Sequence, residues 1–307
     1  MSIRSAIQSE YADLGSVRLH YLRAGEGAGT GAPPGPILFI HGFPEFSGAW
    51  EPQLREFGRD RCAFAPDLRG YNLSSKPDGV APYAMPLLAD DLRRFIAQVA
   101  GGPCTVVAHD WGGVCAWHLA AAYPESVAKL VIINSPHPAA LHRELVHNAA
   151  QREAMRYMLL FRSARAEALL SENDHARLAV LFASWQIGGE PLDAALVAAY
   201  HRAWSQPGAL TAMLNYYRAS DLHPSGPNDP GADTVPAPAG TWPIRVPTRV
   251  IWGERDAALL PGLLDGLDTF VPGVEICRIA AGTHWVVHEF PAEVNRLIRE
   301  FVDRPAA

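Results

Sequence analysis

Short apolar runs alternate along this chain with segments whose apolar residues recur every three or four positions. The short runs suit buried strands and the longer segments suit amphipathic helices, so the alternation predicts an α/β fold, a parallel sheet with helices packed on its faces. Helices are expected at 85–99 and 289–302, and an antiparallel hairpin at the sheet edge is expected from 11–14 and 17–22. The apolar runs that predict the remaining strands are 36–40, 62–66, 104–108, 130–133, 248–252 and 274–279.

The alternation of strands and helices is interrupted in the middle of the chain. Residues 138–220 have a mostly helical pattern, and 221–243 contain six prolines and three glycines, which favours a loop. Because the strand pattern then resumes, the core is expected to consist of 1–137 and 244–307. Residues 138–243 are expected to form a helical cap, with a Pro- and Gly-rich return linker, over the carboxyl end of the sheet. The helices expected within this cap are 152–161, 176–185 and 207–217.

Asp110 lies where the strand expected at 104–108 turns directly into a helix. Ala108 and Gly112 are small enough for the two backbone arms to pass close together, as in the strained elbow that raises a nucleophile above a parallel sheet. A carboxylate that attacks a carbonyl gives a reactive anhydride, whereas attack on a saturated, electrophilic carbon gives an ester that water can hydrolyse. Asp110 is therefore a candidate nucleophile toward an alkylating substrate.

Hydrolysis of such an ester requires a base that accepts a proton from water. His284 follows the last expected strand and is therefore expected at the same sheet edge as Asp110. His288 is the rival, but it lies at the start of the final helix, where a surface or capping role is more natural. We expect His284 to be the base.

A catalytic imidazole needs an acceptor that holds its second nitrogen and stabilises the imidazolium. Asp256 lies just after the strand expected at 248–252, and it gives the chain order nucleophile, acid, histidine. Glu254 is the fallback, and Asn134, after another strand, cannot carry the charge. Single acids at loop ends are more often caps or turn formers. The candidate set is stronger than its members because all three follow different strands in the right order.

The loop after the strand expected at 36–40 reads His41-Gly-Phe-Pro-Glu. Its position allows it to aim a backbone N–H at a developing oxyanion. We expect the N–H groups of Phe43 and Trp111 to form the oxyanion hole. The glycine and proline of the loop also shape a tight turn, which is compatible with this role.

A further motif, Asp67-Leu-Arg-Gly-Tyr, follows the strand expected at 62–66. Its composition predicts a structural turn. We expect Asp67 and Arg69 to pair with each other rather than to take part in catalysis.

Several of these motifs together resemble those of a known family. They are 41–45, 67–71, 109–113, Asp256 and 282–284. In these motifs, and over nearly its whole length, the chain resembles the α/β-hydrolase-fold epoxide hydrolases and their dehalogenase relatives. The resemblance implies the α/β-hydrolase fold: a mostly parallel eight-stranded sheet, helices on both faces and an inserted helical cap. It also implies hydrolysis of a small-molecule epoxide to a vicinal diol through an alkyl ester on Asp110.

Epoxide hydrolases of this family use two cap tyrosines as hydrogen-bond donors to the epoxide oxygen. Tyr157 and Tyr217 match the motifs that carry them. A phenol, with a reference pKa of about 10, can polarise the oxygen and then protonate a strongly basic alkoxide. Neighbouring helix residues project about 100° apart, so Tyr216 is not expected to share the role. The residues expected at the substrate are His109, Phe43, Trp111, Tyr157 and Tyr217.

The nearest alternative is a hydrolytic dehalogenase of haloalkanes or haloacids that uses the same three residues. Haloalkane dehalogenases place an indole N–H at the position of Trp111, but commonly have asparagine where this chain has Phe43. Fluoroacetate dehalogenases bind a carboxylate through arginines just after the nucleophile, where this chain has Trp111 and Val114. A third alternative is a non-catalytic ligand-binding protein that kept the hydrolase scaffold.

Charge and composition exclude several classes of partner. The net charge of −6, without a basic block, argues against nucleic acid. No apolar run approaches the roughly 20 residues of a membrane span or resembles a secretory signal, so a cytoplasmic location is expected. Exposed apolar cap surface would support a homodimer. The proposed chemistry needs no cofactor or metal, and no metal-binding spacing to nearby carboxylates is evident at His137, His142, His147 and His201.

Overall fold

The structure is a computed structural model that describes residues 6–26, 35–183, 193–227, 229–236 and 242–304. Its sheet has eight strands in the order β1-β2-β4-β3-β5-β6-β7-β8. β1 and β2 form an antiparallel hairpin, β2 runs antiparallel to β4, and all other neighbours are parallel. The strands are β1 (Gln8–Asp13), β2 (Arg18–Ala24), β3 (Ile37–Ile40), β4 (Ala63–Pro66), β5 (Cys104–His109), β6 (Val127–Ile133), β7 (Thr248–Gly253) and β8 (Glu275–Ile279). The predicted α/β-hydrolase fold is confirmed.

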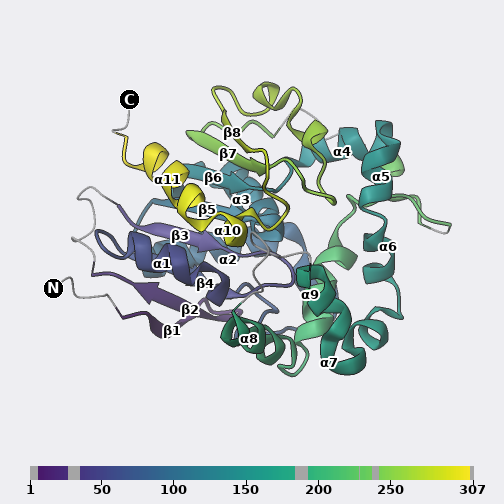
Figure 1. Cartoon of the computed structure of the whole chain (residues 1–307), viewed down its shortest axis with the longest axis horizontal. Helices are drawn as coiled ribbons and strands as arrows, with labels where there is room; N and C mark the ends of the chain where they lie inside the picture. The colour runs from purple at the N-terminus through teal and green to yellow at the C-terminus, as the bar shows by residue number, and fades with distance from the viewer. Residues whose placement is uncertain (1–5, 27–34, 184–192, 228, 237–241, 305–307) are drawn as a thin grey trace.

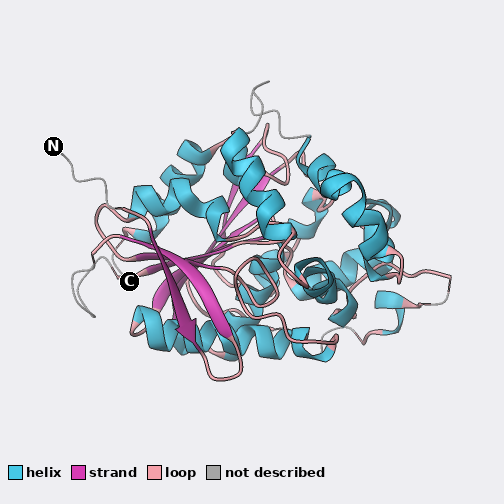
Figure 2. Ribbon diagram, turned by 90° about the horizontal axis from the view of Figure 1, so that it is seen from below, coloured by secondary structure: helices cyan, strands magenta, loops and turns pink. Residues whose placement is uncertain are grey.

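Helices cover both faces of this sheet, and Figure 2 shows the strands between two helical layers. All residues of β3, β4, β5 and β7 are buried, as parallel strands covered on both sides must be. Along β5, Val106 packs into the same apolar cluster as the second and third helices, whereas Val107 packs with the first and last. The helices of these layers are α1 (Glu51–Phe57), α2 (Met85–Phe95), α3 (Asp110–Ala122), α10 (Val286–Glu289) and α11 (Pro291–Val302).

In the described residues between β6 and β7 there are six α-helices, and Figure 1 shows them gathered on one side of the sheet. The segment expected at 152–161 is divided between two helices, and residues 184–185 of another expected helix lie outside the described residues. In the expected linker, 228 and 237–241 lie outside them too. The helices are α4 (Pro138–His147), α5 (Ala149–Ala154), α6 (Tyr157–Arg162), α7 (Ala166–Ala183), α8 (Ala194–Trp204) and α9 (Ala209–Ala219). The division into a core and a cap, with its boundaries, stays a prediction.

The predicted pairing of Asp67 with Arg69 is wrong. Asp67 lies 2.6 Å from His20 Nδ1 on β2, while Arg69 donates two hydrogen bonds of 2.7 Å to Asp91 on α2. The turn directs the two side chains to different neighbours, and it remains structural as predicted. No described helix combines the length and the apolar character that a membrane crossing requires.

Candidate active site

Asp110 occupies a tight bend between β5 and α3. Its φ of +48° is unusual for a residue other than glycine, and its neighbour His109 is still extended. A Cβ at Gly42 would lie 2.4 Å from the Cβ of Asp110, and one at Gly112 would lie 2.4 Å from the carbonyl oxygen of His41. Both positions therefore require glycine. The backbone segments at this bend pass as close to each other as the sequence predicts.

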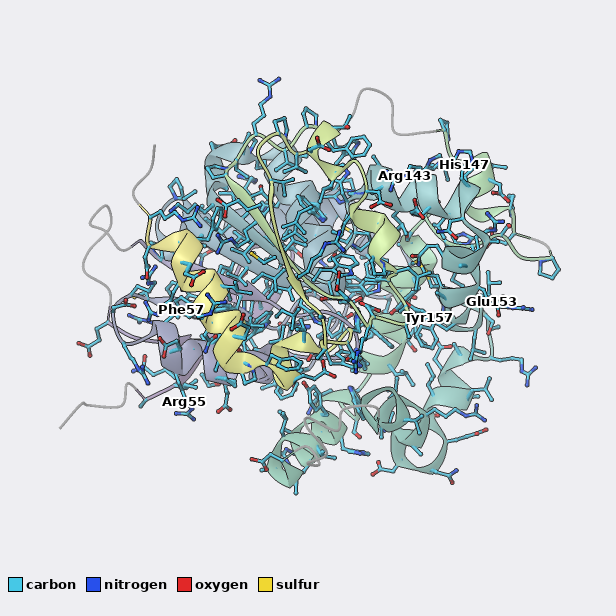
Figure 3. The ribbon with its side chains drawn as sticks, turned by 45° about the horizontal axis from the view of Figure 1, so that its top comes forward. Arg55, Phe57, Arg143, His147, Glu153 and Tyr157 are labelled. Atoms are coloured by element: carbon cyan, nitrogen blue, oxygen red, sulfur yellow. The ribbon has the colours of Figure 1, made fainter. Side chains whose placement is uncertain are left out.

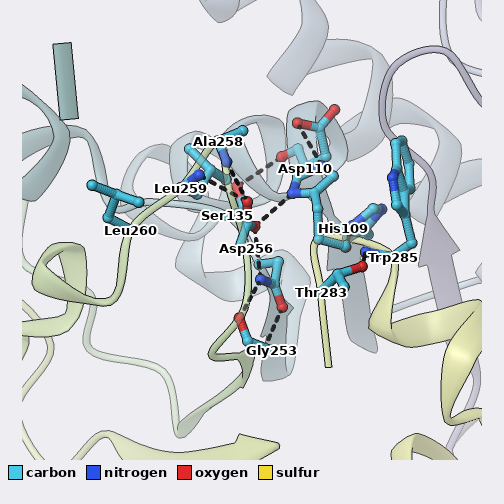
Figure 4. Close-up of polar contacts among 12 residues, drawn as sticks. His109, Asp110, Ser135, Gly253, Asp256, Ala258, Leu259, Leu260, Thr283 and Trp285 are labelled. Carbon is cyan, nitrogen blue, oxygen red and sulfur yellow. Dashed lines mark hydrogen bonds and ion pairs between the residues drawn. The ribbon is translucent and has the colours of Figure 1, made fainter. Parts of the chain in front are cut away.

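Asp110, Asp256 and His284 follow β5, β7 and β8 and converge at the carboxyl ends of these strands. Figure 4 shows Asp110 and Asp256 in this site. His284 Nδ1 lies 2.7 Å from Asp256 Oδ2, and its Nε2 lies 3.6 Å from Asp110 Oδ2. The three side chains are thus brought together in the order that the sequence predicts. The gap to Asp110 is longer than a hydrogen bond and short enough for one small movement to close it.

Asp256 is held as a buried anion by several donors. Its Oδ1 accepts hydrogen bonds of 2.8 Å from the N–H groups of Ala258 and Leu259, and its Oδ2 accepts one of 2.8 Å from Asn134 Nδ2. Burial raises the pKa of Asp256, but His284 and these donors outweigh it and lower the pKa below its ordinary value. Sequence reasoning gave Asn134 no role beside Asp256, although its place at the end of β6 is a signal for one.

The pKa of His284 is set by opposing effects. Burial lowers it, but the charge of Asp256, the hydrogen bond to Asp256 and the nearby charge of Asp110 raise it well above the ordinary value of a histidine. The two carboxylates beside His284 therefore favour the protonated imidazole. Any reaction that neutralises Asp110 removes part of this effect and lets the proton leave.

The carboxylate of Asp110 contacts the loop after β3. The N–H of Phe43 donates a hydrogen bond of 2.7 Å to Asp110 Oδ1, so this group already faces the oxygen where negative charge would return. Ser135 Oγ, which sequence reasoning missed, donates one of 2.7 Å to the backbone carbonyl of Asp110. A role for the N–H of Trp111 in the oxyanion hole stays a prediction.

The alternatives to the acid and the histidine lie elsewhere. Glu254 pairs at the surface with Arg278 at 2.9 Å, so it is not the partner of His284. The predicted surface or capping role of His288 is wrong. Its side chain is buried, and its Nε2 lies 2.6 Å from Glu45 Oε1. Its place on α10 brings this side chain to the loop after β3, which carries Glu45, instead of toward solvent.

His109 makes two buried contacts that the sequence analysis did not predict. It is fully buried, its Nε2 donates a hydrogen bond of 2.8 Å to the carbonyl of His284, and its Nδ1 lies 3.1 Å from Glu45 Oε2. His109 therefore positions the backbone of His284, and in the described part of the chain it does not line either cavity beside Asp110. The predicted contact of His109 with substrate stays a prediction.

Glu45 is the centre of this buried network. Besides the two histidines, it accepts a hydrogen bond of 3.0 Å from Tyr200 Oη on α8. Burial raises the pKa of Glu45, but His288 and His109 outweigh it and hold the pKa far below its usual range. The loop after β3, the residue before Asp110 and a helix of the inserted segment are therefore joined through one carboxylate.

We expect Glu45→Ala to lower the free energy of unfolding by about 3–5 kcal/mol, because it leaves buried polar partners unpaired. Since the pKa of Glu45 is depressed, its stabilising effect is present above the ordinary pKa of glutamate and fades as pH falls. Denaturant unfolding at neutral pH and below about pH 4 would show a difference from wild type that shrinks in acid. The exposed Glu153 supplies the matched control, Glu153→Ala (Figure 3). A change below about 1 kcal/mol at neutral pH would contradict this account.

Two cavities, of about 450 and 410 Å³, meet at the candidate nucleophile. Asp110, Tyr157 and Tyr217 line both of them, so the carboxylate and the two phenols face a shared space. Tyr157, labelled in Figure 3, begins α6, and Tyr217 lies on α9. Apolar side chains such as Met155 and Leu222 line much of the larger cavity. The site is suited to a largely apolar small molecule.

Aromatic contacts fix the orientation of Tyr217. Its ring packs edge-on against Phe43 and Trp111, with centroid distances of 5.1 and 5.0 Å. Tyr216 instead donates its hydroxyl hydrogen to the carbonyl of Arg69 at 2.7 Å, as expected for a neighbour that points another way. Burial, and then nearby groups that include Asp110, raise the pKa of Tyr157 and Tyr217 above the ordinary value. Both phenols therefore keep their protons and can act as donors.

An acid at a strand-to-helix bend, with a histidine near it and a second acid behind the histidine, is the arrangement of an α/β hydrolase. Residues 35–291 match the family described as alpha/beta hydrolase fold. The AB hydrolase superfamily protein YfhM of Bacillus subtilis is 35% identical, over 96% of this chain and 98% of its own. Epoxide hydrolase 3 of Mus musculus is 34% identical, over 93% of this chain and 74% of its own.

Solved structures agree with these sequence relatives. The crystal structure of Bacillus megaterium epoxide hydrolase in complex with an inhibitor has a TM-score of 0.86 and 34% identity, covering 96% of this chain and all of that one. An epoxide hydrolase from metagenomes of hot environments has a TM-score of 0.83 and 32% identity, covering 97% and 99% of the two chains. The chain belongs to the alpha/beta hydrolase fold family, among its epoxide hydrolases.

Proposed function

We propose that this protein hydrolyses an epoxide to a vicinal diol through an alkyl ester on Asp110. The observation that carries the proposal is the shared cavity, where the carboxylate of Asp110 faces the phenols of Tyr157 and Tyr217. The relatives named as epoxide hydrolases support the same reaction. The surrounding inserted helices act as the cap that encloses the substrate.

In the first half-reaction, a carboxylate oxygen of Asp110 attacks one ring carbon of the epoxide. A carbon–oxygen bond to Asp110 forms while the ring carbon–oxygen bond breaks, and its electrons move to the epoxide oxygen. Tyr157 and Tyr217 donate hydrogen bonds to that oxygen, and one of them transfers its proton to give a hydroxyl. Their raised pKa values keep the proton available and make the resulting phenolate a strong base.

In the second half-reaction, water attacks the ester carbonyl carbon of Asp110. Esterification has removed the charge of Asp110, so the pKa of His284 falls and the imidazole can accept a proton from water. Asp256 stabilises the imidazolium, and the N–H groups of Phe43 and Trp111 hold the oxyanion. Collapse breaks the ester bond, the imidazolium protonates the departing alcohol, and the acid proton of Asp110 returns to the phenolate.

Dehalogenation is the second enzymatic candidate, because it shares every step except the leaving group. A halide leaves as an anion, so a dehalogenase needs hydrogen-bond donors that stabilise the anion and keep their protons. An epoxide oxygen stays bonded to the product and must gain a proton. Two phenols that line the cavity beside the nucleophile fit the second requirement. A non-catalytic binding protein is disfavoured because His284 lies between Asp110 and Asp256, where it can act as a base that Asp256 stabilises.

The double variant Tyr157→Phe/Tyr217→Phe is expected to slow diol formation by a factor of about 10²–10⁴, because no acid remains for the epoxide oxygen. The test is a panel of styrene-type, aliphatic and fatty-acid epoxides, with haloalkanes and haloacetates, scored for diol and halide together. Tyr216→Phe is the matched control, since its hydroxyl is bonded to a backbone carbonyl instead. Unchanged epoxide turnover in the double variant, with halide released from organohalides, would favour dehalogenation.

A homodimer and a cytoplasmic location remain predictions.

A further inference from the structure

Three side chains that could bind a metal ion meet on the inserted helices, away from Asp110. Asp174 and His175 come from α7, and His201 comes from α8. Their potential ligand atoms all lie within 4.8 Å of one another. Asp174 Oδ2 is 3.2 Å from His201 Nδ1, and Asp174 Oδ1 is 3.8 Å from His175 Nδ1. One carboxylate thus faces both imidazoles, one with each oxygen.

The backbone of α7 departs from helical geometry where two of these residues lie. Asn173, Asp174 and His175 have φ values of +49°, +55° and +61°, between two helical parts of α7. Asn, Asp and His are the residue types, apart from glycine, that enter this left-handed region most readily. At this break, potential ligand atoms of both Asp174 and His175 lie within 4.8 Å of one on His201 of α8.

Each of the two histidines has a ring nitrogen that makes no hydrogen bond. Nδ1 of His175 and Nδ1 of His201 are buried and make no hydrogen bond. Their side chains are 12% and 26% exposed, whereas that of Asp174 is 78% exposed. Apart from the nearby carboxylate of Asp174, these atoms have no polar contact that would compensate for their removal from water, and a buried nitrogen without a hydrogen bond calls for an explanation such as an ion. The exposed side of Asp174 leaves an entry path from solvent.

We propose that Asp174, His175 and His201 bind a divalent transition-metal ion of the zinc type and that this ion joins α7 to α8. Two imidazoles with one carboxylate are a ligand set that zinc accepts, with a water molecule in the fourth position. Zinc bonds of about 2.0–2.1 Å place neighbouring ligand atoms about 3.3 Å apart, close to the 3.2 Å between Asp174 and His201. His175 needs only a small approach to complete the set.

The site is connected to the loop beside Asp110. The ring of Trp204 lies 5.2 Å from that of His201 and 6.1 Å from that of His175. The same Trp204 donates its indole N–H to the carbonyl of Pro44, at 2.6 Å. An ion that holds α7 against α8 therefore stabilises the helix that packs on this loop. The expectation that His201 has no metal-binding partners missed this site, because the partners come from another helix and meet it only in the folded chain.

The test is a calorimetric titration of the full, metal-stripped chain with Zn²⁺, with thermal unfolding measured with and without the ion. We expect one Zn²⁺ per chain and a rise in melting temperature of several degrees at saturation. His175→Ala and His201→Ala should each weaken binding at least about tenfold and remove the thermal shift. His147→Ala is the matched control, because His147 is an exposed cap histidine outside the cluster (Figure 3).

Two results would overturn the proposal. One is wild-type protein that takes up no stoichiometric Zn²⁺. The other is wild-type affinity in both histidine variants, which would place the ion elsewhere, for example at His284. Asp174→Asn serves as a second ligand variant if either alanine variant folds poorly, and circular dichroism checks the fold. Titration of His284→Gln separates this site from the active site, because it should bind Zn²⁺ as the wild type does.

Discussion

Asp110→Ala is expected to reduce kcat/KM for epoxide hydrolysis by a factor of about 10⁴–10⁶, to the level that binding and positioning alone can supply. The variant removes the atom that forms the bond to substrate. The neighbouring carboxylate of Asp256 cannot replace it, because Asp256 already binds His284, Asn134 and two backbone N–H groups. The measurement is diol formation under steady-state conditions.

A loss of folding must be separated from a loss of chemistry in this variant. Asp110 lies at a bend with positive φ, so alanine there is strained, and melting temperatures should accompany the kinetic data. Asp268→Ala, at an exposed aspartate, is the control and should keep full activity. A folded Asp110→Ala enzyme with more than about one hundredth of wild-type turnover would show that another group is the nucleophile.

His284→Gln is expected to reduce steady-state turnover by a similar factor, but at the second half-reaction. Asp110 can still attack the epoxide, whereas no base remains for the water that opens the ester. A single equivalent of epoxide should therefore be consumed quickly without release of diol. His288→Gln is the informative control, because His288 contacts Glu45 and should affect stability more than turnover.

Much of the fold follows from local sequence. The runs at 104–108 and 248–252 are mostly apolar, and all their residues are buried because helices cover both faces of these strands. The positions of Asp110, Asp256 and His284 at one edge of the sheet could be predicted because each lies in the segment after a strand, and parallel strands bring their carboxyl ends to the same edge.

The interactions that sequence reasoning missed depend on contacts between distant segments. His288 appears as a helix-start residue in sequence, yet its environment is set by Glu45, 243 positions earlier. His109 lies beside the nucleophile, but the carbonyl of His284 and Glu45 occupy its nitrogens. The breaks around residue 155 and within α7 have no proline or glycine to mark them, so periodicity alone could not reveal them.

The central claim is a covalent ester on Asp110, and mass spectrometry of the His284→Gln protein after epoxide treatment tests it most directly. We expect the proteolytic peptide that contains Asp110 to gain the mass of the whole epoxide, with fragmentation placing the added mass on Asp110. Wild-type protein should show little of this adduct at the end of turnover. An unmodified Asp110 peptide in the folded variant, under conditions where wild type forms diol, would contradict the covalent route.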